Sequence, residues 1–491
     1  MHSHARSGKL RFDAVVIGSG MGGGTAAYRL ATSGLKTLLL ERGDFVDPKG
    51  ERPAQPGIFI EEIHAPADGE MSYVGGQAKF YGASMYRLRE SDFRAVSHEA
   101  GVSPAWPLSY GDLEPYYCEA EELYRVHGEV GDDPTEPPHS LPYPFPSLPH
   151  DGSVAKLFGA LRAAGSRVSS IPKALDYSEQ GRCVLCGTCD AHFCTRDAKV
   201  DPEIACIRPA LATGLLTLLT RADCIKVLTD ASGTRVKGVL VRHSDEVVEV
   251  GAPIVVLSGG ILNTPLLLWR SRTDAHPEGL GNAGGALGRY LSGQSSTPVF
   301  PIVGRLDFAR DHVKTFSLNE FYDQGPDWPY PMGTIQVCGL LPFWKSSTLP
   351  IRPLAFALGK VSLMCFCVTE ALPDRETGYT FGDDGVVDKR PPIWNAGSLS
   401  KLRSAAIEAF RKAGYVSFAP RATPHVKSEV GTARCGDDPL TSVTDPDCQV
   451  HGVQGLFVAD ASVLATAGAV NTALTIAAMA LRAADKAVRN H

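Results

Sequence analysis

The sequence has no surplus of basic residues. Lys and Arg number 48 and Asp and Glu number 54, which gives a formal net charge of −6. A protein that binds nucleic acid or an anionic membrane needs a basic surplus, so we expect neither partner. The chain also lacks an apolar run of transmembrane length, and residues 1–13 lack the apolar region of a secretory signal. These absences predict a soluble cytoplasmic protein.

Several catalytic signatures are missing as well. The 491 residues contain no supported Ser/His/Asp triad, kinase loop or HExxH motif. Hydrophobic residues make up 44% of the chain and charged residues 21%, so the chain can bury a core and is not a disordered polymer. Its length predicts two or three domains.

Cysteine is moderately frequent, and five of the twelve cysteines lie within residues 183–206. Four of them have spacings that resemble those of iron–sulfur ligands: Cys183, Cys186, Cys189 and Cys194. The fourth comes one residue later than in the ferredoxin pattern, no Pro follows it, and His192 offers a further zinc ligand. We predict thiols and no resident metal here. An iron–sulfur cluster, a zinc ion and a local disulfide remain the alternatives.

The order of expected elements is that of an interrupted α/β fold. Residues 12–17 predict a strand, followed by a Gly-rich turn, a helix closed by Gly34 and a strand at 37–41. Residues 455–460 predict another strand and 472–490 a terminal helix. Between these ends, strand-like stretches mixed with turns predict a second, largely antiparallel unit. The expected class is α/β, α+β overall.

A dinucleotide-binding motif follows the first expected strand. Residues 18–23 form a G-x-G-x-x-G between a strand and a helix, with Glu41 at the end of the next strand. Gly18 permits the tight turn, Gly20 lets a pyrophosphate approach the backbone, and Gly23 lets helix and strand pack closely. The helix N-terminus offers N–H donors to the phosphates, and Glu41 can accept hydrogen bonds from a ribose. The motif alone does not separate NAD from FAD.

Five segments together resemble the glucose–methanol–choline (GMC) oxidoreductase family. They are FDAVVIGSGMGGG at 12–24, VGGQAKFYGASMYRLRESDF at 74–93, VVLSGGILNTPLLL at 255–268, LGRYL at 287–291 and the most specific segment, 431–485. The resemblance implies FAD, held by a split Rossmann-type domain formed by residues 1–296, which include the Cys-rich segment, and 422–491. It implies a substrate domain with a largely antiparallel sheet at 297–421.

The resemblance also implies which residues hold FAD. The motif glycines hold the pyrophosphate, Glu41 the adenosine ribose, and Cys224 presents backbone to the adenine. The last helix begins near the flavin, where its partial positive charge stabilises an anionic reduced flavin. The implied set is Gly18, Gly20, Gly23, Glu41, Arg42, Val74, Gly75, Gly82, Cys224, Asp460, Ala461, Asn471 and Thr472. An alternative role for Asn471 is the N-cap of that helix.

The FAD is expected to be non-covalent. Some relatives link FAD to a His in the loop that corresponds to 74–93. In this chain Phe80 occupies the matching position, between Lys79 and Tyr81, and none of the three is a usual histidyl acceptor.

The general base of the family is missing from its usual position. In the family a His three residues before a Gly-Thr pair takes the hydroxyl proton. Here the pair is Gly431-Thr432, and Ser428 stands three residues before it. A Ser hydroxyl cannot hold a proton at neutral pH as imidazole does, and loss of a general base costs about 10²–10⁴ in rate. The second partner of the family site, Asn471, is present.

Three accounts of this difference stay open. In the first, another group such as His425 is the base, although in an extended segment it would need a local bend to face the flavin. In the second, Ser428 and Asn471 only orient a substrate that is an easier hydride donor. In the third, alcohol oxidation is lost.

The sequence therefore predicts an FAD-dependent oxidoreductase acting on CH–OH donors. The loop 74–93 resembles that of pyranose and glycoside oxidoreductases, which suggests a sugar, a glycoside or a related metabolite as substrate. Oxygen or another small molecule is the expected electron acceptor. The alternatives are lyase-like chemistry on the same fold, or a catalytically inactive flavoprotein that serves as a partner.

Overall fold

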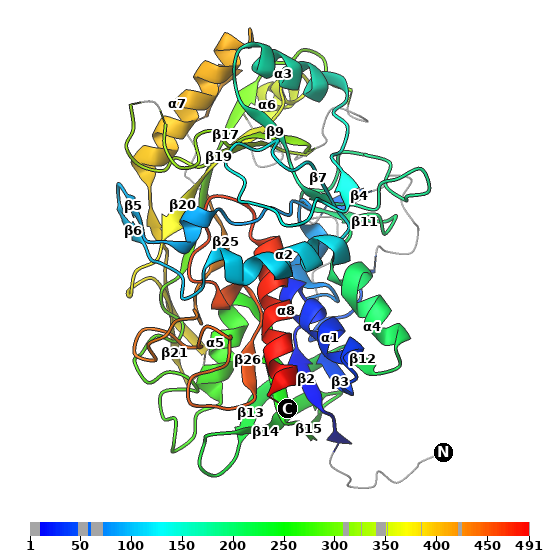
Figure 1. Ribbon diagram of the computed structural model, residues 1–491, viewed down its shortest axis with the longest axis vertical. Coiled ribbons are helices and arrows are strands. Elements are labelled where there is room, and N and C mark those ends of the chain that lie inside the picture. The colour runs from blue at the N-terminus through cyan, green and yellow to red at the C-terminus, as the bar shows by residue number, and fades with distance from the viewer. Residues whose placement is uncertain are drawn as a thin grey trace.

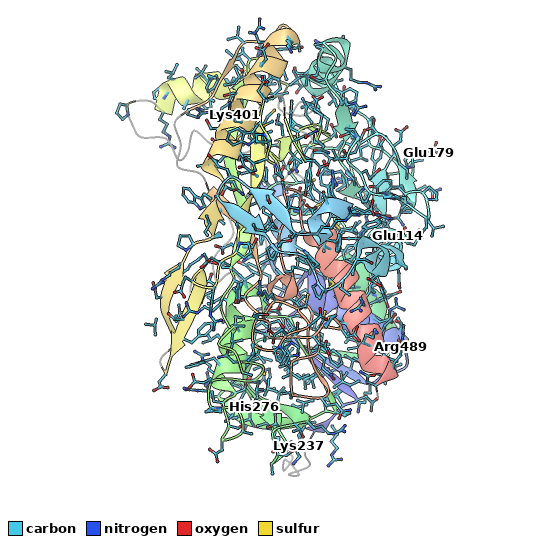
Figure 2. The ribbon with its side chains drawn as sticks, turned by 60° about the vertical axis from the view of Figure 1, so that its left-hand side comes forward. Glu114, Glu179, Lys237, His276, Lys401 and Arg489 are labelled. Atoms are coloured by element: carbon cyan, nitrogen blue, oxygen red, sulfur yellow. The ribbon has the colours of Figure 1, made fainter. Side chains whose placement is uncertain are left out.

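The computed structural model describes residues 10–47, 57–59, 72–307, 314–325, 327–339, 350, 352–383, 385–420 and 425–490. Figure 1 shows two parts stacked along the longest axis, with α7 at the top and β13 to β15 at the bottom. The same order is visible in the side-chain view, where Lys401 of α7 lies toward one end and Lys237 of β14 toward the other (Figure 2).

The lower part is built on a parallel sheet of five strands. All four strand pairs are parallel, and short apolar runs such as TLLL in β3 are buried throughout, as a sheet covered on both faces requires. The sheet order is β12 (Leu216–Leu219), β3 (Thr37–Leu40), β2 (Ala14–Ile17), β16 (Ile254–Leu257) and β26 (Leu456–Val458). The strand near the C-terminus thus completes a sheet begun at the N-terminus, which confirms the expected split domain.

Helices and a second sheet surround this core. The helices are α1 (Met21–Thr32), α2 (Tyr110–Leu123), α4 (Arg208–Ala212), α5 (Gly260–Arg270) and α8 (Ala473–Arg489). α8 packs against both α1 and α2, and its buried face is rich in alanine, which permits close approach. The second sheet contains β1 (Leu10–Arg11), β15 (Glu246–Gly251), β14 (Val236–His243) and β13 (Ala222–Thr229).

The upper part is an antiparallel sheet of eight strands, and every pair in it is antiparallel. The main path is β24 (Ser417–Phe418), β17 (Ser292–Pro301), β20 (Cys365–Leu372), β19 (Thr334–Val337), β18 (Phe316–Leu318) and β9 (Val168–Ser170). β23 (Ile393–Trp394) pairs with β20, and β25 (His425–Val430) pairs with β17. The sheet confirms the expected antiparallel unit, but β9 and β25 come from outside 297–421, and the domain boundaries stay a prediction.

One face of the antiparallel sheet carries the second hydrophobic core. Ile335, Val337 and Cys367 are buried there together with Leu161 and Phe410 of two covering helices. The covering helices are α3 (Gly152–Ala163) and α7 (Ala396–Lys412), and α6 (Arg352–Gly359) lies nearby (Figure 1). Because side chains alternate along a strand, the neighbouring even-numbered residues of β19 and β20 point to the opposite face, toward the lower part.

Short elements complete the described chain. They are β4 (Gly57–Phe59) with β11 (His192–Cys194), β7 (Val126–Gly128) with β8 (Phe145–Pro146) and β10 (Lys173–Ala174), β5 (Val96–His98) with β6 (Gly101–Ser103), and β21 (Gly378–Gly382) with β22 (Gly385–Arg390). Within the described residues, no helix combines the length and the apolar character that crossing a membrane requires.

Candidate functional site

The first Gly-rich turn is packed so tightly that side chains are excluded at three positions. Gly18 has φ +95°, and a Cβ there would lie 2.3 Å from Ser258 O. A Cβ on Gly23 would lie 1.8 Å from Gly18 O, and one on Gly22 would lie 1.6 Å from Ala459 O. The turn after β2 is therefore pressed against the ends of β16 and β26. The contact of Gly22 with the C-terminal strand is one that sequence reasoning missed.

Gly20 differs from these glycines because its Cα faces open space. The atom nearest to a Cβ placed there is Gly76 Cα, 4.0 Å away. Gly20 is the N-cap of α1, no side chain caps this helix end, and its first turn holds no acidic residue. The N–H groups and the positive end of the helix dipole are thus available to an anion. This arrangement fits the pyrophosphate of FAD.

Glu41 closes the turn from the other side. Its buried carboxylate accepts hydrogen bonds from Ser19 N (3.1 Å), Ser19 Oγ (2.5 Å) and Gly43 N (2.8 Å). Arg42 donates to Ser72 Oγ (3.1 Å). The backbone N–H of Ala222 donates to Glu41 O (2.9 Å), which brings β13, and with it Cys224, to the end of β3. The residues implied for the adenosine half of FAD are therefore close together.

The second implied loop is attached to the first turn. Gly75 has φ +93°, and its N–H donates to Ser19 Oγ (3.1 Å), while Val74 is fully buried. Gly82 lies against the Cys-rich segment, because a Cβ there would lie 2.0 Å from Asp190 Oδ1. Phe80 is buried at the end of the short helix η2 (Gly76–Phe80).

Asp460 directs its carboxylate into the backbone around it. Oδ2 accepts from Gly260 N (2.8 Å) and Thr264 Oγ1 (2.5 Å), and Oδ1 accepts from Ser462 N (2.7 Å) and Ser462 Oγ (2.5 Å). Burial raises the pKa of Asp460, which these hydrogen bonds oppose. Ala461 O accepts from Gly431 N (3.2 Å), so this turn also positions the Gly-Thr pair.

Asn471 presents an unpartnered polar atom. Its Oδ1 is buried and has no hydrogen-bond partner among the described residues. The N-cap of α8 is Thr472, and no side chain caps that end, so the alternative that Asn471 is the N-cap is wrong. Asn471 lies one residue earlier, on the loop that leads into the helix. Its carboxamide oxygen is therefore available to a ligand hydroxyl.

Ser428 lies in a β-bulge. β25 pairs with β17 at Gln294–Lys427 and again at Ser292–Val430, and the register shifts between these pairs. Ser428 has φ +50°, which is uncommon for a residue with a side chain. The bulge re-aims the side chain relative to a regular strand. His425 is the first residue of β25, but its side chain lies outside the described residues, so its role as a base stays a prediction.

Sequence reasoning also missed the polar face of the antiparallel sheet. Gln294 donates through Nε2 to Val470 O, and Thr334 donates to Ala469 O (3.0 Å). Gln336 lies on the same face as Thr334, and its Oε1 is buried without a partner in the described chain. The alternation of polar and apolar residues in TIQV was the available signal. These side chains hold the loop before Asn471 and leave polar atoms beside it.

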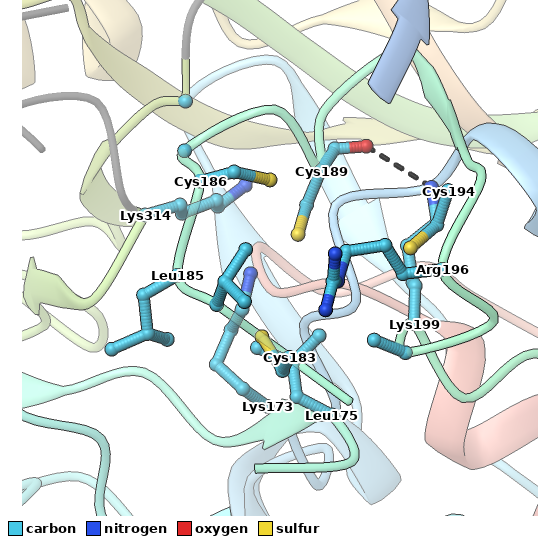
Figure 3. Close-up of a pocket in the computed structure, with 14 residues that line it drawn as sticks. Lys173, Leu175, Cys183, Leu185, Cys186, Cys189, Cys194, Arg196, Lys199 and Lys314 are labelled. Carbon is cyan, nitrogen blue, oxygen red and sulfur yellow. Dashed lines mark hydrogen bonds between the residues drawn. The ribbon is translucent and has the colours of Figure 1, made fainter. Parts of the chain in front are cut away.

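The four clustered cysteines line a cavity of about 30 Å³ together with Lys173, Lys199, Lys314 and Arg196. Figure 3 shows Cys183, Cys189 and Lys173 pointing toward the same space. All twelve cysteines are free thiols, and the described residues hold no group of three or more His, Cys, Asp or Glu side chains arranged for a metal ion. The volume suits a water molecule or two rather than a substrate.

The Cys-rich segment also supports the second loop. Lys199 Nζ donates to Tyr81 O (3.0 Å), Cys189 O (3.1 Å) and His192 O (2.6 Å). Lys173 Nζ donates to Gly82 O. Burial lowers the pKa of both lysines.

The chain is similar to several known proteins. Paromamine 6'-oxidase from Streptomyces fradiae is 28% identical, covering 96% of this chain and 90% of its own. C-glycoside 3-oxidase from Microbacterium trichothecenolyticum is 27% identical, covering 88% of this chain and 80% of its own. The crystal structure of pyridoxine 4-oxidase from Mesorbium loti shares the fold, with a TM-score of 0.66, 18% identity and coverage of 98% and 99%.

Family models match most of the chain, with residues 305–392 of the upper part unmatched. Residues 13–47 match the FAD binding domain family, and residues 72–304 and 393–480 match two models of the GMC oxidoreductase family. FAD is therefore the cofactor, and the chemistry is FAD-dependent oxidation of a CH–OH group. The chain belongs to the GMC oxidoreductase family.

Proposed function

We propose that this protein oxidises a hydroxyl group of a sugar, a glycoside or a related polar metabolite, with FAD bound non-covalently and with Ser428 in place of the histidine base of the family. The observation that carries the proposal is the buried, unpartnered Oδ1 of Asn471 at the start of the last helix. A buried acceptor without a partner is costly, so it indicates a ligand that donates a hydrogen bond.

Each polar group has a role in this proposal. Asn471 Oδ1 accepts a hydrogen bond from a substrate hydroxyl and so positions the reacting group. Ser428 orients the substrate from the bulge of β25. Gln336 Oε1 accepts a hydrogen bond from a further substrate hydroxyl. Bound FAD supplies the acceptor for the hydride that leaves the C–H bond.

The substrate class rests on chemistry and on the relatives. The site offers several buried polar atoms, as binding of a hydroxyl-rich molecule requires. The printed names of two relatives, paromamine 6'-oxidase and C-glycoside 3-oxidase, support oxidation of a glycoside-type hydroxyl. The electron acceptor is oxygen or another small molecule, and neither nucleic acid nor a membrane is an expected partner. A cytoplasmic location stays a prediction.

The proposal is tested by product analysis. The holoenzyme is incubated with a panel of sugars, glycosides and simple alcohols and with oxygen or an artificial electron acceptor. We expect one substrate class to lose two hydrogens while an equal amount of acceptor is reduced. Cleavage of the substrate without consumption of acceptor would indicate lyase-like chemistry. No product from any compound would favour a catalytically inactive partner. Both of these alternatives are tested because Ser428 stands where the family has its base.

A further inference from the structure

A lysine lies one residue from the position of the missing base and on the face of the sheet that carries the site. Lys427 is paired directly with Gln294 across β25 and β17. Directly paired residues of antiparallel strands point to the same face. Gln294 reaches Val470 O from that face, and Val470 is the residue before Asn471. The Lys427 side chain therefore extends along the side of the sheet that contacts the active-site loop.

The ammonium group of Lys427 lies over an aromatic ring. Lys427 Nζ lies 5.0 Å from the centre of the Phe366 ring. Phe366 is paired directly with Gln336, whose Oε1 has no partner among the described residues. The ammonium group thus lies on the face that holds Gln336, between the antiparallel sheet and the loops of the FAD-binding domain.

Three titratable groups from other segments act on Lys427 electrostatically: Lys314, Asp190 and Cys338. Lys314 Nζ lies 3.6 Å from Asp190 Oδ1, and Asp190 Oδ2 accepts from Gly339 N (2.8 Å). Asp190 in turn lies against Gly82 of the second FAD loop. The cluster therefore connects the sheet to the part of the chain implied to lie along the flavin. Glu370, which is paired with Gln294 from β20, is engaged by Ser103 Oγ (3.0 Å) and His98 (3.3 Å).

The four groups of this cluster differ in the pH at which they change charge. Burial and the adjacent ammonium of Lys314 lower the pKa of Lys427 to about 8. Lys314 keeps its proton, because Asp190 raises its pKa despite burial. The pKa of Asp190 falls to about 2, because the attraction of Lys314 and Lys173 outweighs its burial. Burial raises the pKa of the Cys338 thiol to about 12, which leaves it neutral. Of the four groups, Lys427 is the one that changes charge near neutral pH.

We propose that the ε-amine of Lys427 is the general base that takes the hydroxyl proton of the substrate, in place of the histidine of the family. This inference rests on the proposed function. In the step, the substrate O–H proton goes to the neutral amine and gives an ammonium. FAD, held at the Gly-rich turn, would supply the acceptor for the hydrogen that leaves the C–H bond as a hydride with both electrons, and the carbon would become a carbonyl. The ammonium returns its proton to solvent before the next turnover.

A lysine that is buried beside a second cation is suited to act as a general base. A general base works best when its pKa lies near the operating pH, and a lysine reaches this range when it is buried beside another cation. Asn471 positions the substrate, while Lys427 removes the proton of the reacting hydroxyl. The competing role for Lys427 is that of a permanent cation that binds an anionic group of the substrate.

The first test separates a base from a cation. The rate of FAD reduction is measured anaerobically, in a rapid-mixing instrument, for Lys427→Ala and Lys427→Arg holoenzymes. Loss of a base lowers this rate by about 10²–10⁴, and arginine does not restore it, because a guanidinium cannot be deprotonated in a protein. Small primary amines added to Lys427→Ala should restore part of the rate. An Lys427→Arg enzyme with normal rate, or an Lys427→Ala enzyme that changes only KM, would overturn the proposal in favour of a cation.

The second test reads the titration without any turnover. The holoenzyme is acetylated briefly at a series of pH values, and the modification of Lys427 is measured by mass spectrometry. Only the neutral amine reacts, so the profile gives the midpoint of its titration. We expect a midpoint near 8, which rises in Lys314→Met, where the repelling cation is removed, and falls in Asp190→Asn, where the attracting anion is removed. A midpoint near that of an ordinary lysine, about 10.4, and unmoved by both variants, would overturn the proposal.

The two failures are distinguishable. If no hydroxyl compound reduces the FAD of the unaltered protein, the proposed function fails. If a substrate reduces it and the rate is the same in Lys427→Ala, the proposed function stands and the lysine base fails. The ratio of flavin to protein absorbance shows whether the Lys427→Ala and Lys427→Arg variants retain FAD, so a misfolded variant is recognised. For Lys314→Met and Asp190→Asn, the acetylation profile also reports whether Lys427 stays buried.

Discussion

The hydroxyl of Thr334 donates a hydrogen bond to the backbone carbonyl of Ala469 at 3.0 Å. Thr334 belongs to the antiparallel sheet, and Ala469 belongs to the loop that leads into α8. Gln294, on another strand of the same sheet, donates to Val470 O next along the loop. The position of Asn471 is therefore fixed by the substrate domain on one side and by the FAD-binding helix on the other.

Replacement of Asn471 by Ala should slow the reaction and leave FAD in place. The side chain makes no hydrogen bond through Oδ1 in the described chain, so its loss removes the hydrogen bond proposed to the substrate. We expect the rate of FAD reduction to fall by about 10²-fold, as for loss of a contact that positions the substrate. The ratio of flavin to protein absorbance measures FAD content.

A matched control lies at the other end of the same helix. Asn490 is the C-cap of α8 and is exposed, so Asn490→Ala should retain the normal rate. An Asn471→Ala enzyme with unchanged turnover would refute the role assigned to Asn471.

The contact of Gly22 with the last strand should be intolerant of even one methyl group. A Cβ there would lie 1.6 Å from Ala459 O, which is backbone. We expect Gly22→Ala to lower the free energy of unfolding by about 1–3 kcal/mol or more and to weaken FAD binding. Urea denaturation and FAD content give the two readouts.

Gly159 is the control for Gly22, since it is also helical but exposed in α3 with nothing within 4 Å of a Cβ. Gly159→Ala should stabilise the protein by about 0.5–1 kcal/mol. Equal stability of the two variants would contradict the packing described for the Gly-rich turn.

The parts of the fold that follow from local chemistry are predictable from the sequence. The motif glycines, Glu41 and the apolar strand at 14–17 indicate the first βαβ unit, because each requires a specific local conformation. The return of residues 456–458 to the same sheet follows from resemblance rather than from periodicity. Pro115 and Pro265 lie inside helices, where tertiary packing overrides local preference.

The parts of the fold and the site that the sequence does not predict depend on which strands become neighbours. The bulge at Ser428 exists because β25 pairs with β17 on both sides of it, and no pattern within HVKSEV indicates that shift. The cluster of Lys314, Asp190 and Lys427 joins three segments distant in the chain. Long-range pairing of this kind leaves no local periodicity. The alternation in TIQV indicates a polar side of one strand, but only the structure shows which segments that side meets.

FAD should leave the protein when it unfolds. The position that corresponds to the covalent His of some relatives is Phe80, which is buried in an aromatic contact with Tyr73 at 5.8 Å. Neither ring can form a histidyl bond to FAD. After denaturation in acid, the flavin absorbance should appear entirely in the filtrate that passes a small-pore membrane. Retention of the flavin with the precipitated polypeptide would show a covalent link.

Asp92 should make stability depend on pH in the neutral range. Burial, together with Glu370 nearby, raises the pKa of Asp92 to about 7, whereas an unfolded Asp has a pKa of about 3.9. The folded state therefore holds the proton more tightly, and this contribution, full at low pH, is lost as pH rises through 7. We expect the free energy of unfolding to fall by a few kcal/mol, at about 1.4 kcal/mol per pKa unit.

The Asp92→Asn variant should remove most of that fall, because its amide stays neutral at every pH. The control is Asp112→Asn. Hydrogen bonds from Ser109 lower the pKa of Asp112, so its contribution is lost only as pH falls below about 4. Urea denaturation at about pH 5 and pH 8 measures both. If the free energy of unfolding falls as much in Asp92→Asn as in the unaltered protein, another group causes the pH dependence.

The measurement that tests the account most directly is an anaerobic absorbance titration of the holoenzyme with sugars, glycosides and simple alcohols. We expect one class of glycoside or sugar to bleach the flavin bands stoichiometrically and simple alcohols to bleach them weakly. Flavin bands that no hydroxyl compound bleaches, although dithionite does, would contradict it.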